Sequence, residues 1–146
     1  TEGYEHTGYY NNKYIPRAGE SGAQTELNYL TNYRAIRYSD VLLMAAEAYN
    51  RGGIDDGIAQ EYLNQVRRRA FGDQDHDIFL TGTALTDAIW EERKFELSME
   101  GHRFFDLVRT EQAPSIIDGF QQGKHEVFPI PQQEIDISGL TQNPGY

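Results

Sequence analysis

The sequence predicts a mainly α-helical fold with long irregular loops and little β structure, and two observations lead to this prediction. Apolar residues recur at spacings of three and four through 38–71 and 83–110, which is the periodicity of helices with one buried face. Residues 1–37 and 111–146 lack that periodicity and are rich in glycine, asparagine or proline. We therefore expect one unit of 146 residues with helices in its middle and irregular segments at both ends.

Segment 1–37 is predicted to be loop with short extended pieces, and it holds the candidate ligand-binding residues. Seven of the ten tyrosines lie in the first 38 residues, without helical spacing. A tyrosine ring can stack on a sugar ring whose hydroxyls are held by nearby Asn, Arg or Asp. Tyr9, Tyr10 and Tyr14 are therefore candidate ligand-binding residues. The alternative is that these rings pack beneath their own segment.

Residues 38–71 are predicted to form a hairpin of two antiparallel helices. Ser39 is the expected N-cap of the first helix and Gly52-Gly53 its expected stop. The second helix is expected over about 56–69, with acidic residues at its start and three arginines at its end. The apolar stripes that should pack together comprise Tyr38, Val41, Leu42, Ala45, Ala48, Tyr49, Ala59, Leu63, Val66 and Ala70. The unit has the length of a tetratricopeptide repeat.

Two further helices are predicted within 83–110, followed by an irregular tail. The first should span about 84–100, with Thr83 as its cap and Gly101 at its end, and the second about 102–109. Five glycines and prolines within 114–131, followed by Pro144-Gly145, should prevent long helices in 111–146. Residues 126–128 are the one expected extended strand.

Two carboxylates fall on the apolar face of the predicted third helix. Glu92 and Glu96 lie within the stripe that should face the core, and buried charges are costly unless paired. We therefore expect a structural network in which arginines meet them. The candidate arginines are Arg37, Arg93, Arg103 and Arg109. The alternative is a glycoside hydrolase that uses Glu92 and Glu96, since residues four apart on a helix bring two carboxylates close together.

Composition excludes several classes of function. Thirteen basic against twenty-three acidic residues give a net charge of −10, so nucleic acid is not an expected partner. The absence of cysteine removes disulfides and thiolate metal sites. The acidic run 73–77 lacks the glycine and the bidentate glutamate of a calcium loop, and the four histidines lack metal-ligand spacing. No metal site and no cofactor are expected.

Five blocks of sequence, in order, resemble the C-terminal part of SusD/RagB proteins. They read RYSDVLLMAAEA at 37–48, YLNQVR at 62–67, ERKFEL at 92–97, EGHRFFDLVR at 100–109, and FPIP with LTQNPGY between 128 and 146. The resemblance covers almost the whole chain and has one small departure at Thr110, where the family often has Trp. In relatives the acidic and basic motif is part of the scaffold. Its positions here are Glu92, Arg93, Glu96, Glu100, Arg103 and Asp106.

The resemblance implies a function as well as a fold. SusD/RagB proteins are non-catalytic lipoproteins on the outer face of the bacterial outer membrane, built on tetratricopeptide-like hairpins. They capture glycans or other nutrients and act as a lid over a SusC-type TonB-dependent transporter. By this resemblance the chain is a fragment of a longer protein, whose lipidated cysteine and most of whose ligand surface lie upstream. The rival interpretation is a tetratricopeptide-like scaffold that binds a protein or peptide.

Overall fold

The structure is a computed structural model that describes residues 12–14 and 32–146. Among these residues it contains six helices and no β strand, which confirms the mainly helical fold class. The strand expected at 126–128 is wrong, because these residues form turns and irregular chain. None of the helices in this described part of the chain combines the length and the apolar character that crossing a bilayer requires.

The described residues fall into two compact units. The chain divides after Glu100, so the described residues up to that position form the first unit and Gly101–Tyr146 form the second. The first unit contains helices α1 to α3, and the second contains helices α4 to α6.

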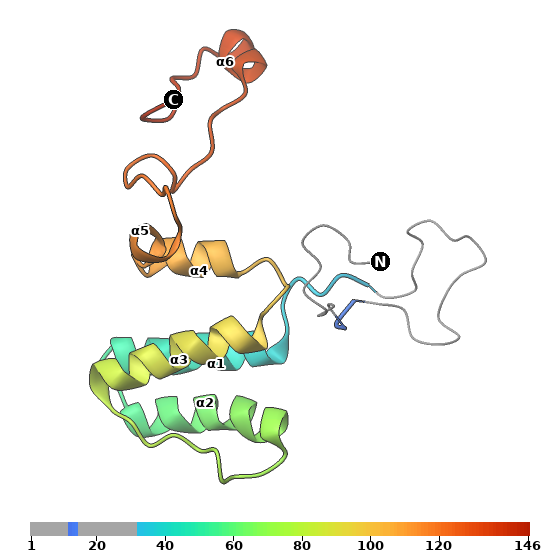
Figure 1. Ribbon diagram of the computed structural model, residues 1–146, viewed down its shortest axis with the longest axis vertical. Coiled ribbons are helices and arrows are strands. Elements are labelled where there is room, and N and C mark those ends of the chain that lie inside the picture. The colour runs from blue at the N-terminus through green and yellow to red at the C-terminus, as the bar shows by residue number, and fades with distance from the viewer. Residues whose placement is uncertain (1–11, 15–31) are drawn as a thin grey trace, which may run out of the picture. The chain divides into compact units, whose positions relative to one another are not determined.

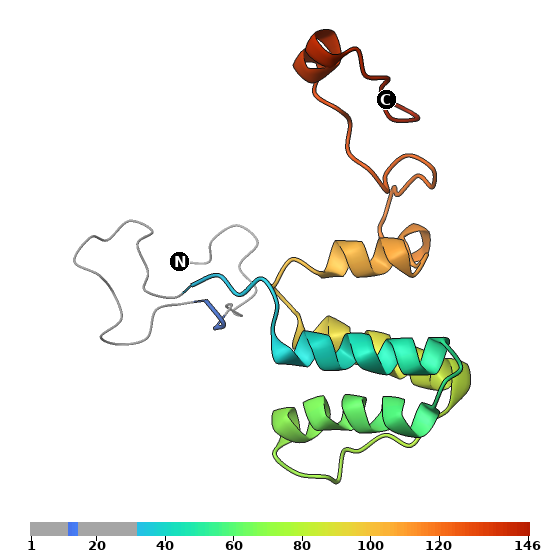
Figure 2. The ribbon, with the colours of Figure 1, turned by 180° about the vertical axis from the view of Figure 1, so that it is seen from behind.

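Helices α1 (Tyr38–Arg51) and α2 (Asp56–Phe71) form an antiparallel hairpin (Figures 1 and 2). The start of α2 is capped by Asp55, whose side chain accepts a hydrogen bond from the Ile58 amide at 3.0 Å. Gly72 ends α2 in the left-handed region, with φ 84°, which glycine adopts without steric cost. Ser39 is not the cap of α1, since the helix begins one residue earlier and the Ser39 hydroxyl accepts from Arg37 Nη1.

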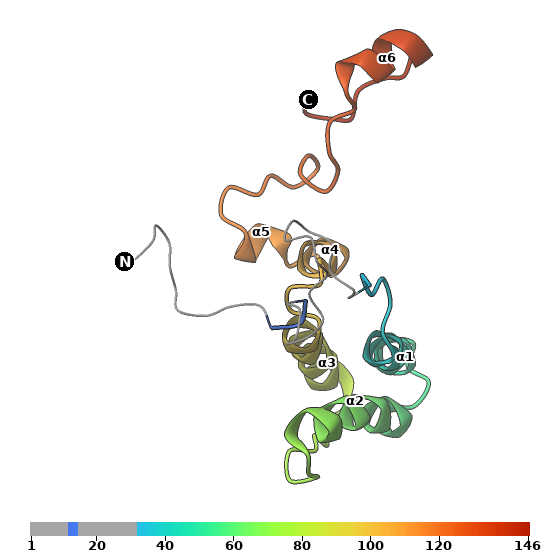
Figure 3. The same ribbon diagram turned by 90° about the vertical axis from the view of Figure 1, so that its right-hand side faces the viewer.

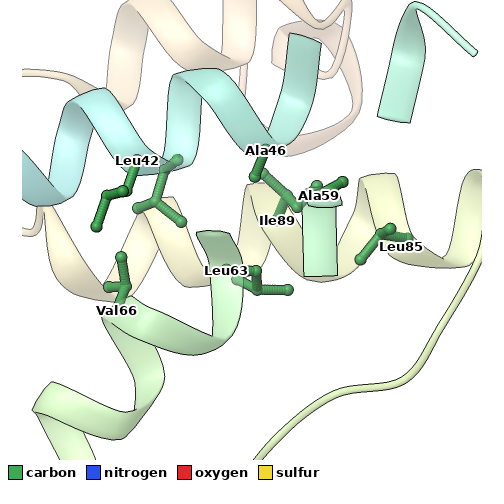
Figure 4. Close-up of a cluster of buried hydrophobic side chains, with 8 residues drawn as sticks. Leu42, Ala46, Ala59, Leu63, Val66, Leu85 and Ile89 are labelled. Atoms are coloured by element: carbon green, nitrogen blue, oxygen red, sulfur yellow. The ribbon is translucent and has the colours of Figure 1, made fainter. Parts of the chain in front are cut away.

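Helix α3 (Gly82–Glu96) packs against both helices of the hairpin, and Figure 3 shows α1 and α3 beside each other with α2 beneath them. The buried core between them is apolar (Figure 4). It consists of Leu42, Leu43, Ala46, Ala59, Leu63, Val66, Leu85 and Ile89. The three helices thus share one core, and burying it is the main apolar contribution to the stability of the first unit.

Contacts with the hairpin fix the start of α3. The Gly82 amide donates to the Asp56 carboxylate at 2.7 Å, and Asn50 donates to the Gly82 carbonyl at 3.1 Å. The helix therefore begins two residues before the expected position, with Thr81 at its N-cap in place of Thr83. It also ends earlier, because 97–100 form a turn in which Met99 has a positive φ of 65°.

The connection between α2 and α3 runs back along α2. Asn64, which is 2% exposed, donates to the Ile78 carbonyl at 2.9 Å and accepts from the Ile78 amide at 2.8 Å. Further along, Arg68 binds the Asp77 carboxylate. A buried asparagine that satisfies both backbone groups of one residue holds the connection in register with the helix.

The second unit contains three short helices. These are α4 (Arg103–Arg109), α5 (Ala113–Ile116) and α6 (Gln132–Ser138). The sequence predicts only α4, because α5 and α6 are too short to show a periodic stripe. Side-chain amides hold the tail between and after them: Gln142 exchanges two hydrogen bonds with the backbone of Ile130, at 2.8 and 2.9 Å.

Candidate functional site

Three carboxylates lie buried along the second half of α3 and the turn that follows it. Glu92, Glu96 and Glu100 are 6%, 9% and 4% exposed. All three carboxylates form ion pairs with arginines, which come from α2 and from the segment before α1. Because an unpaired buried carboxylate is unstable, the positions of these arginines determine whether the acids are structural or available to a ligand.

Glu92 is held by α2 and not by an arginine of its own helix. Its carboxylate accepts from Arg67 Nη1 at 2.7 Å, and the same guanidinium donates through Nε to the His76 carbonyl at 2.7 Å. Arg93 points to the other side and donates to Asp40 at 2.7 Å. Both side chains of the Arg93–Asp40 pair are buried, so this pair locks α3 to the start of α1.

Glu96 and Glu100 share one guanidinium. Arg37 donates to Glu96 Oε1 at 2.8 Å and to Glu100 at 2.7 and 2.8 Å, and its Nη2 also donates to the Glu96 carbonyl. Lys13 Nζ approaches from another segment and lies 2.5 Å from Glu100 Oε1. A second arginine, Arg69 at the end of α2, also binds Glu96. One cluster of charges thereby joins four separate segments of the chain.

The expected network is therefore assembled from partners that the sequence pattern only partly indicates. Of the candidate arginines, Arg37 meets Glu96, whereas Arg93 meets Asp40 instead of either glutamate. Arg67 and Arg69 were not among the candidates. Their spacing offered a signal, because Arg67 lies one turn beyond Leu63 and next to Val66 on the buried stripe of α2.

The remaining predicted members of the network belong to the second unit. Arg109 Nε donates to Asp106 Oδ1 at 2.8 Å, three residues earlier on α4. Arg103 begins α4 and is half-buried, and among the described residues it has no ion-pair partner. The acidic and basic motif, whose members lie close together in the sequence, is thus divided between the two compact units.

Of the three candidate ligand-binding tyrosines, only Tyr14 lies within the described residues; Tyr9 and Tyr10 lie outside them. The ring of Tyr14 stacks on that of Tyr33, with centroids 6.1 Å apart and planes at 19°. The Arg34 guanidinium lies 5.9 Å from the Tyr14 centroid. Tyr33 is 71% exposed, so it presents the free face of this pair. Sequence reasoning missed Tyr33 and Arg34 as neighbours of Tyr14.

Lys13 connects this aromatic group to the charge cluster. Besides Glu100, its ammonium donates to the carbonyls of Glu96 at 2.7 Å and Ser98 at 2.9 Å, where the last turn of α3 leaves carbonyls without helical partners. Since Tyr14 follows directly in the chain, the end of α3 positions the tyrosine stack.

Pairing changes the ionisation of the shared groups. Burial alone would raise the pKa of Glu100, but hydrogen bonds from Arg37 and then Lys13 outweigh it and leave that pKa below its ordinary value of 4.5. The hydrogen bond to Glu100 is also the largest influence on the pKa of Arg37. Together with the interactions of Glu96, it raises the pKa of the guanidinium above its ordinary value. Both shifts favour the charged forms of Glu100 and Arg37.

Two acidic residues in the connection between α2 and α3 are also paired. Asp73 lies 2.8 Å from His76 Nδ1 and accepts from the Asp75 amide, while Asp77 binds Arg68. Across 12–14 and 32–146, no three carboxylate or imidazole groups gather as a cation would require.

Breaking the buried Arg93–Asp40 pair should lower the stability more than breaking the cluster that contains Glu96. Arg93→Met leaves Asp40 buried without its arginine, and should lower the free energy of unfolding by about 3–5 kcal/mol. Glu96→Ala should cost less, about 1–3 kcal/mol, because Arg37 retains Glu100 and the Arg69 side chain is 63% exposed to water. Urea unfolding followed by circular dichroism measures both values.

Glu61→Ala is a control for this comparison. It breaks the ion pair between Glu61 and Arg68, in which the Glu61 side chain is 53% exposed. It should change stability by less than about 1 kcal/mol. Equal losses for Arg93→Met and Glu61→Ala would contradict the structural role of the buried pair.

The charge of Glu100 predicts an acid-sensitive stability. Because its folded pKa lies below 4.5, the protein gains stability from this group above that pH and loses it as the pH falls through the lowered pKa. Thermal midpoints should therefore decrease as the pH is lowered from 5 towards 3. In Glu100→Gln the decrease should be smaller, although the variant is less stable at pH 7. An identical pH profile in both proteins would contradict this assignment.

Comparison with known proteins gives one consistent family. The SusD family model matches residues 1–146. SusD-like protein P2 of Formosa agariphila is 31% identical over 150 residues, which cover 92% of this chain and 29% of that protein. SusD-like protein P25 of the same organism is 32% identical over 123 residues, covering 76% of this chain and 23% of the relative.

Solved structures agree with this assignment. A SusD homologue from Bacteroides thetaiotaomicron superposes with a TM-score of 0.67 at 32% identity, covering 84% of this chain and 30% of that one. A SusD-like protein from Bacteroides fragilis gives a TM-score of 0.68 at 25% identity, over 80% of this chain and 26% of that one. The chain spans less than a third of the length of these relatives. Since the family model matches it throughout and its helices superpose on solved members, the chain belongs to the SusD family.

Proposed function

We propose that this chain is part of a non-catalytic nutrient-binding protein of the bacterial cell surface, with a glycan as its ligand. The protein is held at the outer membrane by a lipid anchor on an upstream cysteine, and delivers its ligand to a SusC-type TonB-dependent transporter. Family membership is the observation that carries this proposal. Because the chain spans under a third of its relatives, ligand, anchor and transporter are proposed for the longer protein.

The side chains around Tyr14 support glycan binding in this part of the protein. The exposed ring of Tyr33 offers a flat apolar surface, and the guanidinium of Arg34, which lies over the Tyr14 ring, can donate to hydroxyls. Lys13 fixes the start of this group to the end of α3. Preorganised aromatic rings bind with a smaller loss of conformational entropy than mobile ones.

The burial of Glu92 and Glu96 argues against the alternative of a glycoside hydrolase. A hydrolase needs its two carboxyl groups on either side of a glycosidic bond, open to substrate. Here each carboxylate is less than a tenth exposed and is held by arginine. These acids act as scaffold.

One observation supports the second candidate, a protein-binding scaffold. Tyr38, Val41 and Met44 lie at helical spacing on α1 and are 74%, 44% and 46% exposed. Such an apolar stripe could receive another helix. If the chain binds no glycan but captures a helical peptide, this second candidate is favoured.

A glycan array followed by calorimetry tests the proposed function. The chain should bind at least one oligosaccharide, and Tyr33→Ala should weaken that binding about ten-fold, equivalent to ~1.4 kcal/mol, through loss of ring stacking. Tyr38→Ala is the matched control, because Tyr38 is equally exposed but lies on α1, where its ring has no stacking partner among the described residues. Equal affinities of the two variants would remove Tyr33 from the ligand site.

A further inference from the structure

A second concave surface lies at the opposite end of α3 from Tyr14. It is a pocket of about 490 Å³ lined by residues at the end of α1 and in the first half of α3. This volume lies within the range of small-ligand sites. Lys13 contacts 96–100, whereas the pocket is lined by residues 82–90 of α3, so the nearest residues of the two places are a little under two turns apart along the chain.

The floor of the pocket is a satisfied hydrogen-bond network. Asn50 donates to Asp56 at 2.7 Å and to the Gly82 carbonyl at 3.1 Å, and accepts from the Thr86 hydroxyl. Asp56 in turn accepts from the Gly82 amide. These bonds fix the end of α1, the start of α2 and the start of α3 together, so the pocket is preformed and its floor has little free hydrogen-bonding capacity.

The wall of the pocket differs from the floor, because its polar side chains keep hydrogen-bonding groups that have no partner within the described part of the protein. Thr83 and Asp87 are exposed on successive turns of α3, and neither side chain has a hydrogen-bond partner among the described residues. Arg51 donates to Glu47 at 2.9 Å through Nη1. Its remaining N–H groups have no partner within the described part of the chain. Two acceptors and a set of donors therefore border the same pocket.

Trp90 supplies the apolar surface of the pocket. The Arg51 guanidinium lies 5.6 Å from the centroid of its ring. Nε1 of Trp90 is buried and has no hydrogen-bond partner among the residues that the structure describes, so the part of the indole that reaches solvent is ring carbon. An apolar ring beside free donors and acceptors suits a ligand that has both C–H and O–H groups, as a pyranose does.

The charges around the pocket select a neutral ligand. Asp87 carries a free negative charge, and the carboxylates of Glu47 and Asp56 are close by through their bonds to Arg51 and Asn50. Among the described residues that line the pocket, Arg51 is the one cation, and it is already paired with Glu47. An anionic sugar would therefore be repelled, whereas a neutral hydroxyl can donate to Asp87 without that cost.

We propose that this pocket binds one residue of a neutral oligosaccharide. The C–H face of the sugar lies on Trp90, one hydroxyl donates to Asp87, and another accepts from Arg51. The choice of a sugar rests on the proposed function, whereas the pocket and its free groups are features of the first unit alone. This subsite is separate from the tyrosine group around Tyr14, and a long glycan could occupy both.

The single tryptophan of the chain makes this proposal directly measurable, because all indole fluorescence comes from Trp90. The probes are maltohexaose, xylohexaose and laminarihexaose, with hexagalacturonate as the acidic comparison. At least one neutral hexasaccharide should change the emission of Trp90 in a saturable way, and hexagalacturonate should not. Asp87→Ala should raise the dissociation constant about ten-fold, as expected for one lost hydrogen bond to a charged group.

Glu91→Ala is the matched control, since Glu91 is exposed on the same helix and does not line the pocket. It removes the same charge and should leave both affinity and emission unchanged. Circular dichroism of all variants checks that the helices are intact.

Calorimetry with the same sugars separates this proposal from the proposed function. If calorimetry detects glycan binding but Trp90 emission is unaffected and Asp87→Ala binds as the wild type does, the pocket is refuted and glycan binding stands. If no sugar binds by either method, both proposals fail for this chain. If hexagalacturonate binds as well as the neutral sugars, the neutral assignment is overturned.

Discussion

The first unit depends on pairing buried carboxylates of α3 with arginines from elsewhere in the chain. Arg67 from α2, Asp40 from α1 and Arg37 from the preceding segment each reach α3 at a different point. The apolar core supplies most of the driving force for packing, but it is non-directional. The ion pairs have defined geometry, and a wrong register would leave charges buried and unpaired. They therefore select one arrangement of the three helices.

The helices themselves could be predicted from sequence because their determinants are local. Leu42, Leu63 and Ile89 lie on the periodic stripes and are buried, and so are Glu92 and Glu96. Tyr38 and Val41, which the pattern places on the packed stripe of α1, are instead 74% and 44% exposed, and Leu43 and Ala46 are buried in their place. The identity of the arginines could not be predicted, since it depends on tertiary arrangement. Because α2 runs parallel to α3, Arg67 and Arg69 lie beside Glu92 and Glu96, and helix periodicity alone contains no information on that pairing.

Other differences between the expected and the observed structure also arise from tertiary contacts. Thr83 is a good cap by composition, yet α3 starts earlier because Asn50 and Asp56 bind Gly82 from outside the helix. At the other end, Arg37 and Lys13 bind the Glu96 carbonyl and so satisfy backbone groups where the α-helix stops. Both boundaries of α3 are thus set by distant residues. Tyr14 stands out in the sequence by its residue type, whereas its stack on Tyr33 is a tertiary contact that the sequence does not indicate.

At the two ends of α3, the groups that the fold uses are distinct from the groups of the proposed binding sites. Groups that the fold needs are satisfied within it: Asn50 uses both its donors and its acceptor, and Glu100 is bound by Arg37 and Lys13. Groups on the outer side of the same turns, such as Asp87, are left to water. A ligand that binds the outer groups therefore does not compete with the bonds that hold the helices together. Exchange of the proposed ligands would then leave the bonds of the core in place.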